Sequence, residues 1–172
     1  MAIKYDLIDG VRVIDVKASD NKYLHKDFHG GPGGGGMNGA IKYLGDTYGE
    51  NAVKDYLRKF SAVFYAPLIE DIKARGLKAM EEKILHDYAE EEVPEDCHTT
   101  LTDTELTVVI DKCPAVMHIK SFGYSPCKWF KYTTSEVYDE IANRSNYGFE
   151  VEYYNEENGA TKYRFFKRGG RK

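Results

Sequence analysis

Two histidines, His25 and His29, are spaced so that they can act together. Residues four apart on a helix lie on one face, so both imidazoles can reach a single metal ion. Lys26 and Asp27 stand between them, so the acid of a metalloprotease HExxH motif is absent. Two interpretations stay open: a metal or catalytic role, or two partly exposed side chains on a helix that Phe28 anchors.

Three cysteines, Cys97, Cys113 and Cys127, are the next candidates. Their odd number and wide spacing favour reduced thiols over a disulfide framework. Cys113 directly precedes Pro114 at an expected helix start, where the helix dipole lowers the pKa of a thiol and makes it a better nucleophile or metal ligand. A packed, inert Cys113 is the alternative. Cys127 follows Pro126 at a second potential helix start, with the same two alternatives.

Tyrosine is abundant, with 14 in the chain. Those of the C-terminal half, among them Tyr124 and Tyr132, can line a polar and aromatic pocket. Tyrosine at alternate positions of a strand is also ordinary sheet packing. His98 follows Cys97, but adjacent residues of a strand point to opposite faces, so these two are not expected to share a metal.

Two other runs are less indicative of chemistry. Residues 30–36 hold six glycines and one proline, which predicts an internal loop. No Gly-Lys-Ser/Thr follows and no parallel strand is expected before it, so neither a phosphate-binding P-loop nor a dinucleotide fingerprint is present. Five acids lie between Glu90 and Asp96. We interpret them as a solvated helix end, because acids at a helix C-terminus are unfavourable and prefer water.

Helical periodicity dominates the first half of the chain. Residues 1–18 alternate around Asp9-Gly10 and predict a hairpin, and a brief helix through Phe28 is expected next. Three further helices are predicted: one from residue 37, one over 51–74 that kinks or restarts at Pro67, and one over 77–91. The last is expected to bury Met80, Ile84, Leu85 and Tyr88 and to expose residues 81–83.

Strand patterns take over after Pro94. Two strands are predicted on either side of residues 102–104, and a final hairpin around Asn158-Gly159. Helices are expected over 114–119 and from a cap at Thr134 or Ser135. Neither half covers its own apolar face, which predicts an α+β fold: a helical N-terminal half packed on a small antiparallel sheet of three to five strands in the C-terminal half.

Size and charge limit the function classes. The 172 residues fit one domain over 1–172, with residues 169–172 as a flexible tail. A formal charge of −4, with the only basic cluster at Lys167, Arg168, Arg171 and Lys172, argues against nucleic acid as a partner. No stretch approaches the roughly 20 apolar residues that span a bilayer, and the first residues lack a signal-peptide core. We therefore expect a cytoplasmic protein that does not enter membranes.

The order of elements in the second half resembles a known family. A strand ending in Cys-Pro (VVIDKCPAVMHI), a Ser-Pro-Cys segment and an aromatic-basic last strand (KYRFFKR) resemble bacterial proteins of the L-2-amino-thiazoline-4-carboxylic acid hydrolase family. The segment YLGDTYGENAVKDYLRKF is similar to that family's helical half, so the resemblance covers about residues 24–167. It implies a hydrolase that opens the ring of a small cyclic amidine acid. The layout is also similar to bacterial 4-vinyl-reductase-type domains, which bind small ligands between helices and an antiparallel sheet.

Two functional hypotheses follow. In the first, the chain is a small-molecule hydrolase of a C–N bond: Cys113 is nucleophile or metal ligand, and His29, helped by His25, is base or metal ligand. Tyr124, Cys127 and Tyr132 would bind the substrate. In the second, the chain is a non-enzymatic sensor domain that binds a small ligand or a metal and signals through a dimer surface. The sequence leaves open whether a divalent metal such as zinc is bound, and whether the chain forms a homodimer.

Overall fold

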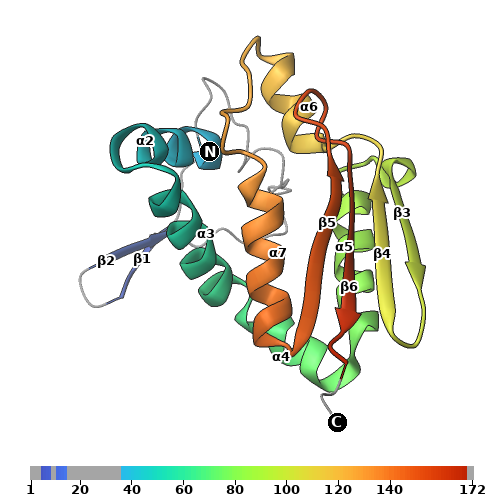
Figure 1. Cartoon of the computed structure of the whole chain (residues 1–172). Helices are drawn as coiled ribbons and strands as arrows, with labels where there is room; N and C mark the ends of the chain where they lie inside the picture. The colour runs from blue at the N-terminus through green and yellow to red at the C-terminus, as the bar shows by residue number, and fades with distance from the viewer. Residues whose placement is uncertain (1–4, 9–10, 15–35, 170–172) are drawn as a thin grey trace.

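The computed structural model describes residues 5–8, 11–14 and 36–169 (Figure 1). The helices of the first half are α2 (Gly36–Tyr48), α3 (Glu50–Phe64), α4 (Ala66–Arg75) and α5 (Leu77–Glu90). The second half contains η2 (Pro94–Asp96), β3 (Cys97–Leu101), β4 (Glu105–Ile110), α6 (Pro114–Ser121), α7 (Tyr132–Arg144), β5 (Tyr147–Tyr154) and β6 (Thr161–Lys167). Strands β1 (Tyr5–Ile8) and β2 (Val11–Ile14) pair antiparallel with each other. The expected α+β class is confirmed.

Four antiparallel strands form the main sheet, in the order β3-β4-β6-β5. Each hairpin contributes two neighbours, and the final hairpin inserts β6 between β4 and β5. In β4, Leu106, Val108 and Ile110 are buried and the residues between them are partly exposed. This burial of every second residue accounts for the alternation of apolar and polar residues that predicted the strand. Tyr163 and Phe165 of β6 lie beside them on the same face.

Helices cover this apolar face of the sheet. Helix α5 packs on β3 and β4, α7 packs on β5, and α3 lies against α7 on the side away from the sheet (Figure 1). A buried hydrogen bond joins the last pair, because the Ser61 hydroxyl of α3 donates to the Val137 carbonyl of α7 at 2.8 Å. The two halves therefore share one apolar core, as the pattern of uncovered faces predicted.

Glycine and proline end the helices where the sequence indicates. Gly49 and Gly76 have φ angles of 86° and 75°, a left-handed region that glycine adopts without steric cost. The helix predicted over 51–74 restarts at Pro67, which stands in the first turn of α4 where its missing amide costs nothing.

Three details of the expected helices are wrong. Helix α7 begins at Tyr132 rather than at Thr134 or Ser135, and no side chain caps it. Glu81 is buried rather than exposed, since it accepts a hydrogen bond from Thr99 of β3 and pairs with Lys78. Leu85 is 40% exposed, because the neighbouring face of α5, which contains Ile84, is the one that packs on the sheet.

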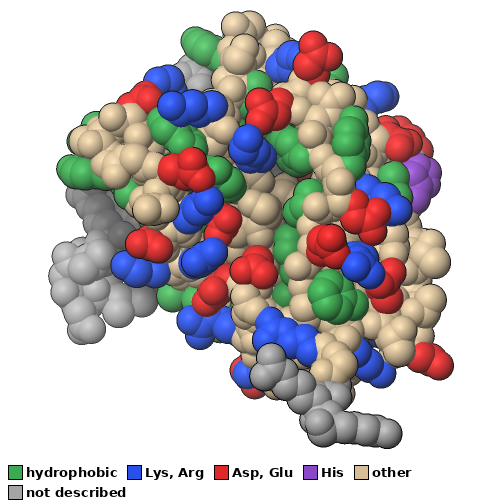
Figure 2. Space-filling model, viewed as in Figure 1, with side chains coloured by type: hydrophobic (Ala, Val, Ile, Leu, Met, Phe, Trp, Pro, Cys, Tyr) green, Lys and Arg blue, Asp and Glu red, His purple; other side chains and the backbone are tan. Residues whose placement is uncertain are grey.

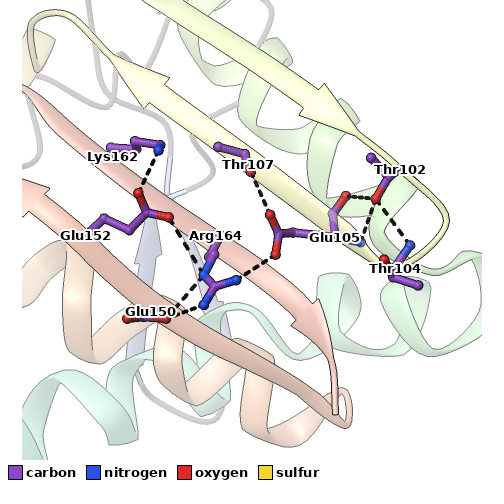
Figure 3. Close-up of polar contacts among 8 residues, drawn as sticks. All are labelled: Thr102, Thr104, Glu105, Thr107, Glu150, Glu152, Lys162 and Arg164. Carbon is purple, nitrogen blue, oxygen red and sulfur yellow. Dashed lines mark hydrogen bonds and ion pairs between the residues drawn. The ribbon is translucent and has the colours of Figure 1, made fainter. Parts of the chain in front are cut away.

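The opposite face of the sheet carries a ladder of charges (Figure 3). Arg164 of β6 binds Glu105 of β4 at 2.8 Å and Glu150 of β5 at 2.7 Å, and Glu152 pairs with Lys162 at 2.6 Å. Cross-strand pairs of opposite charge support sheet pairing. Among the described helices, α5 and α7 pack on the apolar face, and the charged side chains lie on the opposite face.

Several expectations fall outside the described residues. They are the helix through Phe28, most of the glycine-rich run and the end of the C-terminal tail. Within the ranges that the structure describes, no helix has the length and apolar character needed to cross a bilayer. Figure 2 shows acidic and basic side chains interspersed over the visible face, without a large region of one sign.

Candidate functional site

A cavity of about 70 Å³ lies between α3, α5 and α7 and the apolar face of the sheet. One water molecule needs roughly 10–15 Å³ of such volume, so the space holds several waters or a small organic molecule. Its described wall is apolar where Met37, Leu57 and Phe130 contribute. The described wall residues with polar side chains are Cys113, Asp87, Glu91, three threonines and four tyrosines. Mostly apolar concave sites with a few polar groups are typical ligand sites.

Cys113 reaches the cavity wall through the turn between β4 and α6. It is the residue directly before α6, which Pro114 opens as predicted. Its amide donates to the carbonyl of Asn158 at 2.9 Å, so the turn of the final hairpin fixes its backbone. Gly159 on the same turn packs so closely that a Cβ atom there would lie 2.4 Å from the Cβ atom of Cys113.

Burial sets the acidity of this thiol. Burial raises the pKa of Cys113, while hydrogen bonds from the amides of Val116 and Ala115 lower it and the charge of Glu91 raises it. The net direction is upward. The expected effect of the helix N-terminus is therefore present but is outweighed by burial, and the group is a thiol rather than a thiolate at neutral pH.

A cluster of aromatic rings forms the sheet side of the cavity. Tyr138 of α7 packs against Tyr163 of β6, with ring centroids 5.2 Å apart. Tyr88 of α5 completes the set. Burial raises the pKa of all three phenols well above the ordinary value, so they act only as neutral hydrogen-bonding groups.

Two carboxylates line the cavity at the end of α5. Asp87 pairs with Lys83 one turn earlier, and Glu91 is only 3% exposed. The interpretation of residues 90–96 as a solvated helix end is therefore wrong for Glu91, although Glu90, Glu92 and Glu95 are exposed. Position explains the exception, because Glu91 follows Asp87 by one turn and shares its inward face.

The three residues expected to bind a ligand lie outside the described wall of the cavity. Tyr124 is 47% exposed and Cys127 is held through its amide by Asn38 at 2.9 Å. The Tyr132 hydroxyl donates to Glu50 at 2.6 Å. None of these three lies in the described wall of the cavity, whereas Cys113 does.

The hypothesis of a metal site depends on two histidines that the structure does not describe. His25 and His29 lie outside the described residues, so their distance from Cys113 is not part of the site's geometry. Among residues 5–8, 11–14 and 36–169, no three or more His, Cys, Asp or Glu side chains gather as metal ligands. Cys97 and His98 lie on opposite faces of β3, one buried and one exposed, as strand geometry predicted.

Most residues of the cavity wall carry no direct signal in the sequence. Asp87, Tyr88 and Tyr138 read as ordinary members of amphipathic helices, and Thr161 and Tyr163 as ordinary strand residues. These residues differ from other helix and strand residues only because the fold brings them together around the cavity. No family model matches this chain, and no curated protein matches it.

Proposed function

We propose that the chain binds a small organic molecule in the cavity between α3, α5, α7 and the sheet. The observation that carries this proposal is a concave space of about 70 Å³ whose lining residues combine apolar and polar side chains. Tyr138 and Tyr163 supply phenols and Cys113 supplies a thiol at the centre of the fold. Such a site orients a ligand by a few hydrogen bonds and gains affinity from apolar contact.

The acidity of the polar groups supports binding more strongly than catalysis. The phenols and the thiol all have raised pKa values, so at neutral pH they are neutral hydrogen-bond donors and acceptors. A thiol with a raised pKa is a weak nucleophile without a base beside it. This arrangement favours the non-enzymatic hypothesis, a ligand-binding domain of the 4-vinyl-reductase-like type.

A titration followed by amide NMR tests the proposal. The probes are isobutylamine, isobutanol and isobutyrate, which share a branched alkyl group small enough for the cavity. Saturable shifts at the amides of Cys113, Thr134 and Gly159 with at least one probe are expected. Ala115→Leu, which fills space in the wall, should abolish them, whereas Ala74→Leu on the exposed side of α4 should not. Absence of binding by every probe contradicts the proposal.

A thiol-assisted hydrolase of a C–N bond is the second candidate. One observation favours it: Cys113 lies in the cavity wall beside two amides of α6 that stabilise its thiolate. Turnover of L-2-amino-thiazoline-4-carboxylic acid, followed by mass spectrometry of the ring-opened product, tests it. Activity lost in Cys113→Ser and retained in Cys127→Ser supports the enzyme, and no product from the wild type removes it.

The metal-assisted form of either candidate uses His25, His29 and Cys113 as ligands. We propose zinc as the metal, because imidazole and thiolate together suit it. Elemental analysis of protein purified without chelator decides the matter. Near-stoichiometric zinc that is lost in His29→Ala supports this form, and metal-free wild type contradicts it.

A further inference from the structure

The hydroxyl groups that line the cavity differ in whether the fold already uses them. The Thr161 hydroxyl donates to the Tyr153 carbonyl at 2.7 Å, and the Thr133 hydroxyl donates to the Phe130 carbonyl at 2.8 Å. A hydroxyl has one proton to donate, so these two threonines can offer a ligand only an acceptor. Their donors belong to the fold rather than to a ligand.

Two other hydroxyl groups of the wall are not used in this way. Tyr88 of α5 and Thr134 of α7 both line the cavity, and among the described residues neither side-chain hydroxyl has a hydrogen-bond partner. Burial raises the pKa of the Tyr88 phenol well above its ordinary value, so this group keeps its proton. Buried tyrosine hydroxyls usually have a partner, which leaves this one available to a ligand.

The charged groups of the described wall are already engaged. Asp87 pairs with the Lys83 ammonium, and Glu91 is not free either. Among the described wall residues, none has a lysine, arginine or histidine side chain that could balance an anion. An ion that enters such a space loses its hydration without gaining a counter-charge, which is unfavourable. The described wall therefore favours an uncharged ligand.

The remaining wall suits a short alkyl group. Met37, Leu57, Ile110 and Val137 are buried side chains that line the same space. An alkyl group gains affinity when it leaves water for such a surface. The volume of about 70 Å³ limits the ligand to a few heavy atoms.

We infer that the cavity selects small uncharged aliphatic alcohols, an inference that rests on the proposed binding function. The ligand hydroxyl bonds the hydroxyl of Tyr88 or Thr134, and its alkyl group contacts Met37 and Leu57. An alcohol both donates and accepts, so it matches partners that can do either. A carboxylate, such as that of the substrate implied by the family resemblance, meets no counter-charge among the described wall residues.

The three isobutyl probes separate this inference from the proposed function, because they differ mainly in charge. Dissociation constants are measured at pH 7, where isobutylamine is a cation and isobutyrate an anion, from the amide shifts of Cys113 and Gly159. Isobutanol is expected to bind about tenfold more tightly than either ion, or better, because it keeps no charge to desolvate. A smaller preference, or tighter binding of an ion, overturns the inference and leaves the binding function standing. Failure of all three probes overturns both.

Two variants test the assigned hydroxyls. Tyr88→Phe and Thr134→Val each remove a hydroxyl with little change of shape, and at least one of them should weaken isobutanol binding about fivefold. Tyr43→Phe is the matched control, because Tyr43 is 64% exposed and lies outside the described wall, and it should bind isobutanol like the wild type. Unchanged isobutanol affinity in both cavity variants overturns the inference, even where isobutanol binds the wild type.

A fourth probe distinguishes a lost hydrogen bond from a reshaped cavity. In 2-methylbutane a methyl group replaces the hydroxyl of isobutanol, so this probe makes no hydrogen bond. Its affinity for the variant that weakens isobutanol binding should equal its affinity for the wild type. A parallel loss for both probes would mean that the variant changes the shape of the cavity, and would contradict a bond to the removed hydroxyl.

Discussion

Gly159 and Cys113 are in such close contact that a Cβ atom at position 159 would lie 2.4 Å from the Cβ atom of Cys113. The contact joins the turn of the final hairpin to the start of α6. Because the Cys113 amide also binds the Asn158 carbonyl, this turn determines where the thiol enters the cavity wall. The hairpin that the Asn-Gly pair predicts is thus also a support for the site.

Replacing Gly159 by alanine should destabilise the fold by two separable effects. Its φ angle of 69° is left-handed, which costs a residue with a side chain about 1–2 kcal/mol, and the close approach to Cys113 adds about 1–3 kcal/mol of overpacking. Gly123→Ala is the matched control, because its φ angle is 78° and nothing lies within 4 Å of the added atom. Urea denaturation measures both variants, and equal losses would contradict the steric contact.

The hydrogen bond between α3 and α7 should contribute measurably to stability. Ser61 is fully buried and its hydroxyl donates to the Val137 carbonyl, so Ser61→Ala should lower the free energy of unfolding by about 1 kcal/mol. Ser121→Ala removes a hydroxyl that makes a similar 2.7 Å bond to a carbonyl at an exposed site. Its cost should stay within about 0.5 kcal/mol. A reversed order in chemical denaturation would show that the α3–α7 bond is not formed.

Buried thiols should make stability fall at alkaline pH. Burial raises the pKa of Cys97 to about 11, so the folded chain keeps a proton that the unfolded chain loses first. Stability is then complete below the ordinary thiol pKa of about 8.5 and decreases as the pH rises from there toward the folded pKa. Cys97→Ala should reduce this slope between pH 8 and 10, while Thr100→Ala at an exposed position of β3 should not. Parallel slopes for wild type and Cys97→Ala would refute this.

The charge ladder on the open face of the sheet should stabilise the fold in a pH-dependent manner. Arg164 is the main reason that the pKa of Glu105 is lowered, so their attraction is present above the ordinary carboxyl range and is lost as the pH falls through the lowered value. Arg164→Met should therefore lower the melting temperature at pH 7 and much less at pH 3. Thr100→Val, at an exposed position of β3, is expected to show no such convergence. If Arg164→Met lowers the melting temperature equally at pH 7 and pH 3, the cause is lost packing rather than lost charge attraction.

The fold could be predicted from local signals to a large extent. Alternation around residues 102–104 and 158–159 marked the two hairpins, and Gly49, Pro67 and Gly76 marked the helix ends, because these features depend on nearby residues alone. The start of α7 was missed since no side chain caps it. Glu81 was misjudged because its partner, Thr99, comes from a strand that is distant in sequence.

The candidate site was predictable only at Cys113. Its position after a strand and before a proline is a local signal, and the structure places it in the cavity wall. The direction of its pKa shift was not predictable, because burial depends on how α5 and the final hairpin pack over it. Glu91 belongs to an acidic run in which Glu90, Glu92 and Glu95 are exposed, and the facing of α5 toward the cavity separates it from these three.

The most direct test of the central claim is to locate a bound probe by intermolecular nuclear Overhauser effects. The probe is whichever of isobutylamine, isobutanol and isobutyrate binds most tightly, and its methyl protons report the residues they contact. We expect contacts to the ring protons of Tyr138 and Tyr163, inside the cavity. Contacts confined to the exposed rings of Phe64 and Tyr48, or no bound probe at all, would contradict the assignment of the cavity as a ligand site.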